Sequence, residues 1–332
     1  MPEPTRPDLT RRDALGVMTA GLTVAATASA ASAAPDAASL AATTTRRRRV
    51  RLAHLTDIHV QPERGAEAGF AAALAHVRSL EDPPDLVLFG GDCIMDGFSQ
   101  TRDRVDAQWR LWRRTLEAAA LPMPTLACLG NHDVWGWDRS GSGTSGEEPG
   151  WGKARAVEEL GMPGRHYRHE LPGTGWTMLV LDSTQPRGDG YVARIDEEQF
   201  AWLEGELQAI GPEQHVLVLS HIPILAACTF LDGENEESGD WRVPGAWMHI
   251  DARRIKNLFL GHPNVRACLS GHVHLVDQVL YNGVRYCCNG AVCGAWWSGD
   301  RDECDEGYAL VDLFDDGSIE NQYVGFGWSP RE

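Results

Sequence analysis

Short apolar runs alternate with amphipathic stretches along most of this chain, and that alternation restricts the fold more than any other feature. Apolar runs at 50–56, 85–89 and 125–129 are separated by segments whose apolar residues repeat at helical spacing. Strands that alternate with helices predict an α/β fold in which helices cover the sheet. The run 85–89 is almost entirely apolar, as is typical of a strand that is buried on both faces.

The pattern changes to hairpins after residue 275. Asn282-Gly283 and Asp316-Gly317 are strong signals for tight turns between antiparallel strands. Residues 226–248 form a long insert without periodicity that contains several acidic residues and two tryptophans, which makes it a candidate lid over a site. The other elements that we expect are helices at 66–80, 102–119 and 196–209, strands at 215–219 and 265–269, and a hairpin of 166–171 with 176–181.

The first 34 residues have the features of a twin-arginine signal peptide. Arg11 and Arg12 precede a weakly apolar stretch at 14–30, and Ala-Ser-Ala at 31–33 offers a cleavage site of small residues. The stretch is too short and too weakly apolar for a membrane anchor, so we expect no stable membrane insertion. Residues 35–49 are then a linker and 50–332 one domain, exported to the periplasm or the cell exterior.

The charge balance argues against nucleic-acid polymers as partners. The formal net charge is -17, from 47 acidic and 30 basic residues. An acidic surface repels the nucleic-acid backbone and anionic membranes. It does not exclude a small phosphorylated substrate, because bound metal ions can reverse the sign of the field locally. The oligomeric state does not follow from the sequence.

The eight cysteines contain no CxxC pair, which makes a structural zinc knuckle improbable. We expect Cys93, Cys128 and Cys268 to be small buried apolar residues, since they lie in or beside apolar runs. A second group of cysteines lies near the C-terminus. In an exported protein these residues could form a disulfide, but the sequence does not define which of them would pair. That group is Cys287, Cys288, Cys293 and Cys304.

Polar residues of a few types follow five of the expected strands directly. Ligand sites form at the carboxyl ends of strands in sheets that are covered by helices, so five loops converge on one rim. Carboxylate, amide and imidazole groups are donors for a divalent ion that must keep positions open for water and substrate. Glycines before three of these residues permit close approach of the backbone. The residues concerned are Asp57, His59, Asp92, Asn131, His132, Asp133, His221, His272 and His274.

In this order and spacing, the blocks resemble the signature of the calcineurin-like metallophosphoesterases. The matching blocks are Asp57-x-His59, Gly91-Asp92, Gly130-Asn131-His132-Asp133, His221 and Gly271-His272-x-His274. The resemblance implies a four-layer α/β/β/α sandwich, with two mixed β-sheets flanked by helices. It also implies a cofactor of two divalent transition metal ions, and the mixed oxygen and imidazole ligands suit Mn, Fe, Zn or Co.

The resemblance further implies a role for each residue. One ion would be bound by Asp57, His59, Asp92 and His274, and the other by Asp92, Asn131, His221 and His272. Asp92 would bridge the two ions, and a metal-activated hydroxide would attack phosphorus. His132 would face the phosphate and stabilise the transition state or protonate the leaving oxygen. Asp96 and Asp133 are candidates for orienting His132.

Two departures from related groups narrow the activity. Met95 stands where purple acid phosphatases have a tyrosine ligand, and the Gly-Asp block lacks the Asp-Arg-Gly extension of protein phosphatases. We therefore expect a phosphodiesterase that resembles the cyclic-nucleotide and glycerophosphodiester phosphodiesterases. A phosphomonoesterase for small metabolites and a non-catalytic binding scaffold remain alternatives.

The other histidines and the tryptophans have simpler interpretations. We expect Trp135, Trp137, Trp296 and Trp297 to pack in the core rather than to line a substrate pocket. Seven further histidines lack a motif, and we expect them to be turn or surface residues: His54, His76, His166, His169, His215, His249 and His262.

Overall fold

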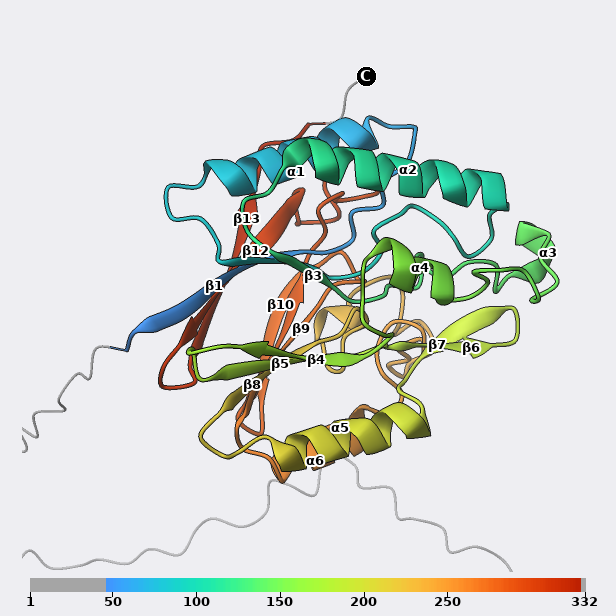
Figure 1. The fold of residues 1–332 in the computed structure, drawn as a ribbon. Helices are drawn as coiled ribbons and strands as arrows, with labels where there is room; N and C mark the ends of the chain where they lie inside the picture. The colour runs from blue at the N-terminus through green and yellow to red at the C-terminus, as the bar shows by residue number, and fades with distance from the viewer. Residues whose placement is uncertain (1–45, 330–332) are drawn as a thin grey trace, which may run out of the picture. The chain divides into compact units, whose positions relative to one another are not determined.

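Two β-sheets pack face to face in the computed structural model, which describes residues 46–329 (Figure 1). The first sheet has five strands in the order β13-β12-β1-β2-β3. Strands β1, β2 and β3 run parallel to one another, whereas β12 is antiparallel to β1 and to β13. These strands are β1 (Arg48–Leu55), β2 (Leu86–Phe89), β3 (Thr125–Ala127), β12 (Gly307–Phe314) and β13 (Ile319–Gly325).

The second sheet has six strands in the order β10-β11-β9-β8-β5-β4. Its four inner strands are parallel, and each edge strand is antiparallel to its neighbour, so this sheet is also mixed. The strands are β4 (Tyr167–Leu171), β5 (Trp176–Val180), β8 (His215–Leu219), β9 (Val265–Ser270), β10 (Val276–Tyr281) and β11 (Val284–Asn289).

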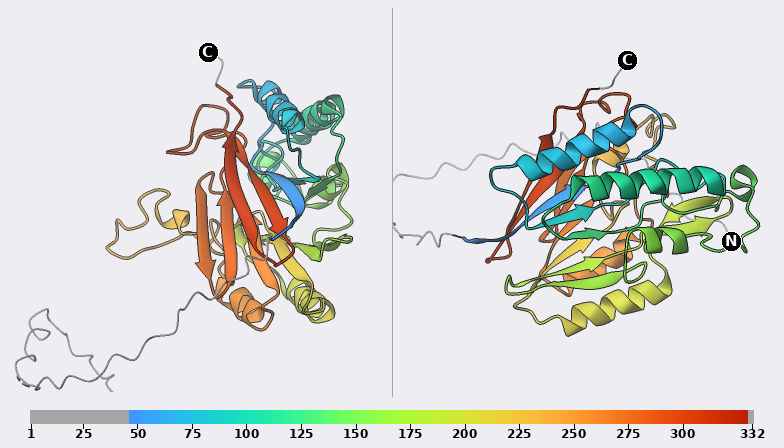
Figure 2. Two further views of the ribbon diagram at one scale, coloured as in Figure 1. Left: turned by 90° about the vertical axis from the view of Figure 1, so that its left-hand side faces the viewer. Right: turned by 45° about the horizontal axis from the view of Figure 1, so that its top comes forward.

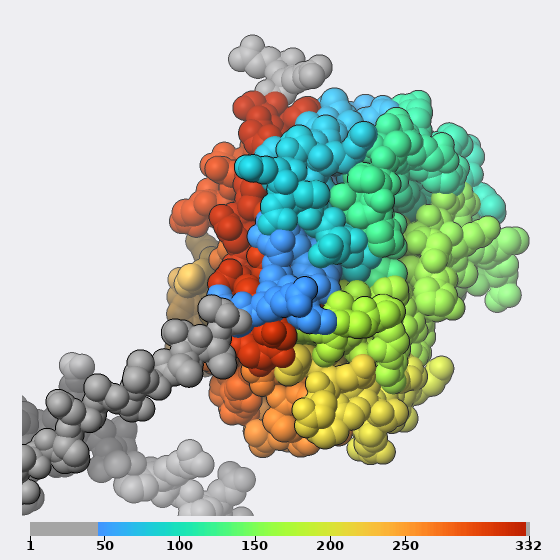
Figure 3. Space-filling model, turned by 60° about the vertical axis from the view of Figure 1, so that its left-hand side comes forward, coloured from blue at the N-terminus to red at the C-terminus, as the bar shows by residue number. Residues whose placement is uncertain are grey.

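Helices cover the outer face of each sheet and complete four layers. Helices α1 (Ala66–Ser79) and α2 (Arg102–Ala119) lie on the first sheet, and α5 (Glu197–Ala209) and α6 (Ala252–Leu260) lie on the second (Figures 1 and 2). This confirms the predicted α/β/β/α sandwich with two mixed sheets. In Figure 3 the blue N-terminal segment lies between the red C-terminal strands and green residues, as the strand order requires.

Local sequence accounts for most of these elements. All four residues of β2 are buried, because this strand lies inside a sheet that is covered on both faces. Helix α1 buries Phe70, Leu74 and Val77 on one side, as its apolar spacing predicts. The Asp196 carboxylate caps α5 by accepting a hydrogen bond of 2.9 Å from the backbone N–H of Gln199.

The structure also departs from the predicted boundaries. Strand β1 begins at Arg48, inside the expected linker, because this strand pairs with β12 and the Arg48 guanidinium binds the Asp82 carboxylate at 2.6 and 2.8 Å. The predicted signal peptide and linker residues 35–45 lie outside the described residues. Within 46–329 no helix is long and apolar enough to cross a membrane.

The sequence patterns did not predict several short elements. They are a hairpin of β6 (Thr184–Arg187) with β7 (Gly190–Ala193), the helices α3 (Arg139–Ser142), α4 (Ala154–Glu159) and α6, and the single 3-10 turn η1 (Cys228–Phe230). The turn η1 is the one regular element inside the insert 226–248, which projects from the strands as a tan segment in the left view of Figure 2.

The cysteines are free thiols throughout the described part of the chain. Cys93, Cys128 and Cys268 are buried among apolar residues, as predicted. The structure shows no disulfide within the C-terminal group. Cys287, Cys288 and Cys293 are buried, whereas Cys304 is half-buried.

Candidate metal centre

Five loops deliver the predicted ligands to one place between the two sheets. Three loops follow β1, β2 and β3 of the first sheet, and two follow β8 and β9 of the second. The ligands are nearly inaccessible to solvent, except that His272 is half-buried. Donors that are more than 200 residues apart in the chain therefore share one site, as the strand-end pattern predicted.

The side chains form two clusters. In the first, His59 Nε2 lies 3.2 Å from His274 Nε2, which lies 3.3 Å from Asp57 Oδ1. In the second, His221 Nε2 lies 3.2 Å from both Asp92 Oδ2 and Asn131 Oδ1. His272 belongs to this second cluster, because its ligand atom lies within 4.8 Å of those of Asp92 and His221.

Asp92 connects the two clusters. Its Oδ2 is 3.2 Å from His221 Nε2 in one cluster and 3.6 Å from His59 Nε2 in the other. Two ring nitrogens that face each other at 3.2 Å, as in His59 and His274, have no good arrangement of lone pairs unless a cation or a proton lies between them. The donor set therefore fits two divalent ions that share one carboxylate.

Unsatisfied buried atoms support this fit. Asp57 Oδ1 and His272 Nδ1 have no hydrogen-bond partner among the described residues. A buried carboxylate oxygen or imidazole nitrogen without a partner is costly in a protein interior, at about 1–3 kcal/mol or more. One ion bound in each cluster would satisfy these two atoms. None of the seven other histidines belongs to the candidate metal groups in the described residues.

Backbone carbonyls orient two of the histidines. The Nδ1–H of His221 donates to the carbonyl of Gly90 at 2.8 Å, and that of His274 donates to the carbonyl of Gly294 at 2.6 Å. Because a carbonyl can only accept, each bond places the proton on Nδ1 and leaves the Nε2 lone pair for an ion.

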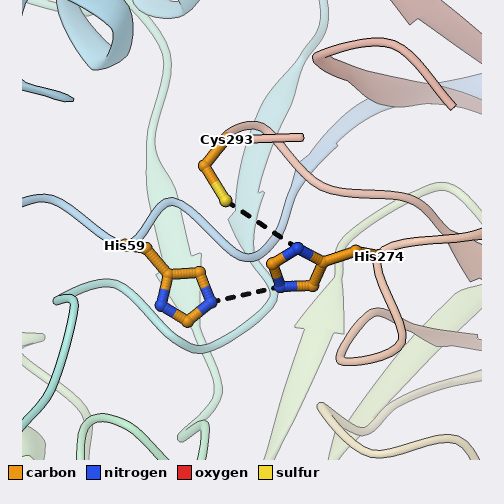
Figure 4. A group of neighbouring side chains, drawn as sticks. All are labelled: His59, His274 and Cys293. Carbon is orange, nitrogen blue, oxygen red and sulfur yellow. Dashed lines mark hydrogen bonds between the residues drawn. The ribbon is translucent and has the colours of Figure 1, made fainter. Parts of the chain in front are cut away.

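Cys293 lies beside the first cluster but on the wrong side of His274 to share its ion. The Cys293 Sγ is 3.9 Å from His274 Nδ1, whereas His59 faces Nε2 on the other side of the same ring (Figure 4). Although the three residues form a compact group, Nδ1 is already engaged by Gly294. The thiol therefore packs behind the ligand.

The electrostatics of the site are governed by burial and by the two carboxylates. Burial lowers the pKa of His59 and of His272 to about 3, which keeps both rings neutral as ligands must be. Burial also acts to lower the pKa of His221, but Asp92 and Asp57 outweigh it and raise that pKa to about 9. A divalent ion would take the place of this proton.

The backbone at the ligands is strained. Asp57, His59, Asp92, His272 and His274 all have positive φ, between 47° and 73°. Residues other than glycine rarely adopt this left-handed conformation, and such strain of about 1–3 kcal/mol each clusters at functional sites. The surrounding contacts therefore hold these side chains in positions that local preference would not select.

Two glycines allow the loops to approach this closely. A Cβ atom on Gly130 would lie 2.1 Å from both the backbone N and Oδ1 of Asp92. A Cβ atom on Gly271 would lie 2.2 Å from Asp57 Oδ2. Any side chain at either position would displace a predicted ligand, which agrees with the close backbone approach expected from the sequence.

His132 is oriented by a group that the sequence did not reveal. Its Nδ1–H donates to the carbonyl of Met95 at 2.5 Å, and its backbone N–H donates to Asp92 Oδ1 at 2.8 Å. Asp96 and Asp133 were predicted to orient it, and both predictions were wrong. Asp96 accepts from the backbone of its own loop, at Phe98 and Ser99.

Asp133 instead ties two ligand loops together. Its carboxylate accepts from the backbone N–H of Cys93 at 2.8 Å and from that of Gly130 at 2.9 Å. Burial and the neighbouring charge of Asp92 raise the pKa of Asp133 to about 6, against the opposing effect of those backbone donors. Asp133 thus fixes the loops after β2 and β3 relative to each other.

A pocket of about 340 Å³ opens onto the two clusters. The insert 226–248 contributes Asp232, Gly233 and Trp247 to its lining, as expected of a lid. Trp296 also lines the pocket, so the prediction that it packs in the core was wrong. Trp135, Trp137 and Trp297 are buried, as predicted. Tyr191 and Arg301 also line the pocket, and no sequence pattern pointed to either residue.

Comparison with known proteins agrees with this geometry. The family described as calcineurin-like phosphoesterase matches residues 50–276. A protein of Arcobacter nitrofigilis named "probable glycerophosphodiester phosphodiesterase" is 25% identical over 211 residues, which cover 64% of this chain and 64% of that protein. The 3',5'-cyclic adenosine monophosphate phosphodiesterase of Escherichia coli K12 is 24% identical over 256 residues, or 74% of this chain and 77% of the enzyme.

Solved structures share the fold at low identity. A dimetal phosphatase from Danio rerio superimposes with a TM-score of 0.56 at 14% identity, over 85% of this chain and 100% of that one. A protein described as the anchor in the inner membrane complex of Plasmodium gives 0.52 at 14% identity, over 84% and 85%. The fold thus occurs both in a dimetal phosphatase and in an anchor protein, and it does not by itself identify an activity.

Proposed function

We propose that this chain, which belongs to the calcineurin-like phosphoesterase family, is an exported hydrolase of small phosphodiesters that uses two divalent metal ions. The observation that carries the proposal is the position of Asp92. Its carboxylate lies within 3.6 Å of a histidine from each of the two donor clusters. A carboxylate in this position could bind both ions at once, so that both ions would act on the same phosphate.

The proposed ligands are the two clusters described above. Asp57, His59, Asp92 and His274 would hold one ion, and Asp92, Asn131, His221 and His272 the other. When bound, such ions lower the pKa of water from 15.7 towards about 7 and neutralise charge on the phosphoryl oxygens. Mn, Fe, Zn and Co all suit this mixture of carboxylate, amide and imidazole donors.

His132 is the residue that we assign to the phosphate. It lies on the pocket wall, and its ring is 4.7 Å from that of His59, in an edge-on arrangement. Because the Nδ1–H of His132 donates to the Met95 carbonyl, a proton for the leaving oxygen must come from Nε2. His132 therefore acts as a general acid or as a donor to the transition state.

A diester substrate is favoured over the alternatives by the sequence relatives, whose names describe phosphodiesterases. A phosphomonoesterase is the second candidate, because the metal clusters by themselves treat both esters alike. The non-catalytic scaffold is the third. It would have no need of the unsatisfied buried atoms or of His132, all of which this chain retains.

Hydrolysis of two chromogenic esters tests the proposal. Enzyme treated with EDTA, then reloaded with Mn, is assayed on bis-p-nitrophenyl phosphate beside p-nitrophenyl phosphate. We expect turnover that depends on metal and favours the diester. A strong preference for the monoester would support the phosphomonoesterase instead. If the metal-loaded protein hydrolyses neither ester, the non-catalytic scaffold becomes the favoured alternative.

Export is the part of the proposal that rests on the sequence. A folded metalloenzyme suits the twin-arginine pathway, which carries proteins that have already folded. Replacing Arg11 and Arg12 with lysine should leave the enzyme in the cytoplasm, while the parent protein appears in the periplasm or the medium. Equal export of both forms would contradict the twin-arginine route, and a parent protein that stays in the cytoplasm would contradict the proposed localisation.

A further inference from the structure

Trp296 forms one wall of the pocket, directly beside the first metal cluster. Its ring centroid lies 4.7 Å from that of His274, at an interplanar angle of 38°, and 6.3 Å from that of His59. The side chain is half-buried, whereas its neighbour Trp297 is 1% exposed. Trp297 therefore packs in the core, whereas the neighbouring Trp296 presents its indole to the pocket.

The backbone holds this ring in place. Trp296 and Trp297 have φ values of 52° and 66°, a conformation that bulky residues seldom adopt. The Trp297 indole N–H donates to the carbonyl of Ile58 at 2.9 Å, and Arg64 donates to the carbonyl of Trp296 at 3.2 Å. Strain that is maintained by several contacts at a pocket wall is typical of a functional position.

The rest of the pocket mouth is aromatic and electrically balanced. Tyr191, whose ring is 6.3 Å from that of His272, and Trp247 of the insert also line it. Arg301 has its guanidinium carbon 5.8 Å from the Trp296 ring centroid, but its charge is paired with Asp232 of the insert. The mouth therefore offers flat apolar surface rather than a free cation for a second anionic group.

We propose that Trp296 is a specificity-determining residue that stacks on a planar aromatic group of the substrate. The preferred substrates are then phosphodiesters that carry such a ring on the ester oxygen next to the reacting phosphorus. The inference rests on the proposed phosphodiesterase function and adds a substrate class to it. Offset stacking on indole favours a planar ring over a saturated ring of similar size.

Two diesters with the same leaving group isolate this effect. Phenyl p-nitrophenyl phosphate and cyclohexyl p-nitrophenyl phosphate both release p-nitrophenolate, and they differ in whether the retained group is flat and aromatic. The quantity measured is the ratio of their kcat/KM values. Comparing this ratio between variants cancels the intrinsic difference in reactivity of the two esters.

The variants separate stacking from a supporting role behind His274. Trp296→Leu removes the indole but keeps an apolar side chain on the same strained backbone, and Trp296→Phe restores a smaller ring. Trp241→Leu is the matched control, because Trp241 is 55% exposed on the insert and does not line the pocket. Metal content and thermal unfolding are measured for every variant.

We expect Trp296→Leu to lower the phenyl-to-cyclohexyl ratio by about threefold to tenfold, in line with aromatic pair energies. Trp296→Phe should recover much of the ratio, and Trp241→Leu should leave it unchanged. An unchanged ratio in a metal-loaded Trp296→Leu enzyme overturns the inference, as does loss of both activities in parallel with loss of metal. If the parent enzyme hydrolyses neither diester, the proposed function itself fails.

Discussion

Gly130→Ala should damage the metal centre from a position that bears no ligand atom. The backbone of Gly130 is outside the left-handed region, so alanine meets no conformational penalty there. Its Cβ atom would nevertheless lie 2.1 Å from the backbone N and from Oδ1 of Asp92, whereas real Cβ contacts essentially never fall below 3.0 Å. The loops after β2 and β3 must therefore separate by nearly 1 Å.

The consequences of this displacement are large, because Asp92 connects both clusters and binds the backbone of His132. A misplacement of about 1 Å at a reacting centre can reduce the rate on the order of 10²-fold. Overpacking a buried site also lowers the free energy of unfolding by about 1–3 kcal/mol. We expect kcat/KM on bis-p-nitrophenyl phosphate to fall about 10²-fold, with a smaller loss of stability.

The assay pairs this variant with Gly205→Ala. A Cβ atom on Gly205, on the exposed face of α5, would contact nothing within 4 Å. This control should leave kcat/KM unchanged and stabilise the helix by up to about 1 kcal/mol. Metal per chain, thermal unfolding and kcat/KM are measured for both. If Gly130→Ala retains parental kcat/KM and a full complement of metal, the close approach of the two loops does not constrain the site.

Three further predictions follow from the same geometry. His221→Ala should lose one metal ion and most turnover while the fold survives, and full metal content with unchanged activity would refute its assignment as a ligand. His132→Ala should keep both ions but slow catalysis by about 10²–10⁴-fold, which metal analysis beside steady-state kinetics can establish. Asp251→Asn should destabilise the fold near neutral pH and progressively less in acid. Burial acts to raise the pKa of Asp251, but its 3.0 Å hydrogen bond with His249, the charge of that ring and the backbone N–H of Ile195 together outweigh burial and lower the pKa. Stability from a lowered carboxyl pKa is present above the unfolded value of about 3.9 and is lost as the pH falls below it. A difference in the free energy of unfolding that stays constant from pH 6 to pH 3.5 would contradict this account.

A dimetal phosphatase and an anchor protein share this fold, so the fold alone does not identify an activity. The sheets and helices provide only the rim, whereas the donors are single residues in short loops. In this chain, each of the five loops retains its donors, and the strained backbone at the ligands persists with them.

The sequence by itself determined the layers and the donors. The apolar run 85–89 and the helical spacing of Phe70, Leu74 and Val77 are local patterns. A buried strand and a helix can therefore be predicted from them without knowledge of the tertiary structure. The donors could be located because each follows a strand directly, and because parallel strands bring their carboxyl ends to one edge. The glycines before the donors are visible in the sequence, but the contacts between loops that require Gly130 and Gly271 became evident only in the structure.

Tertiary structure alone decided the details that set the chemistry. His132 is held by the Met95 carbonyl, and every residue has a carbonyl, so no residue type reveals that bond. Trp296 and Trp297 are adjacent residues of the same type, so the sequence does not distinguish them. The left-handed backbone at both positions directs Trp296 to the pocket and Trp297 into the core. The pair of Asp232 with Arg301 joins positions 69 residues apart. Such contacts depend on how separate loops meet across the rim, and their information lies in the packing of the two sheets rather than in any one segment.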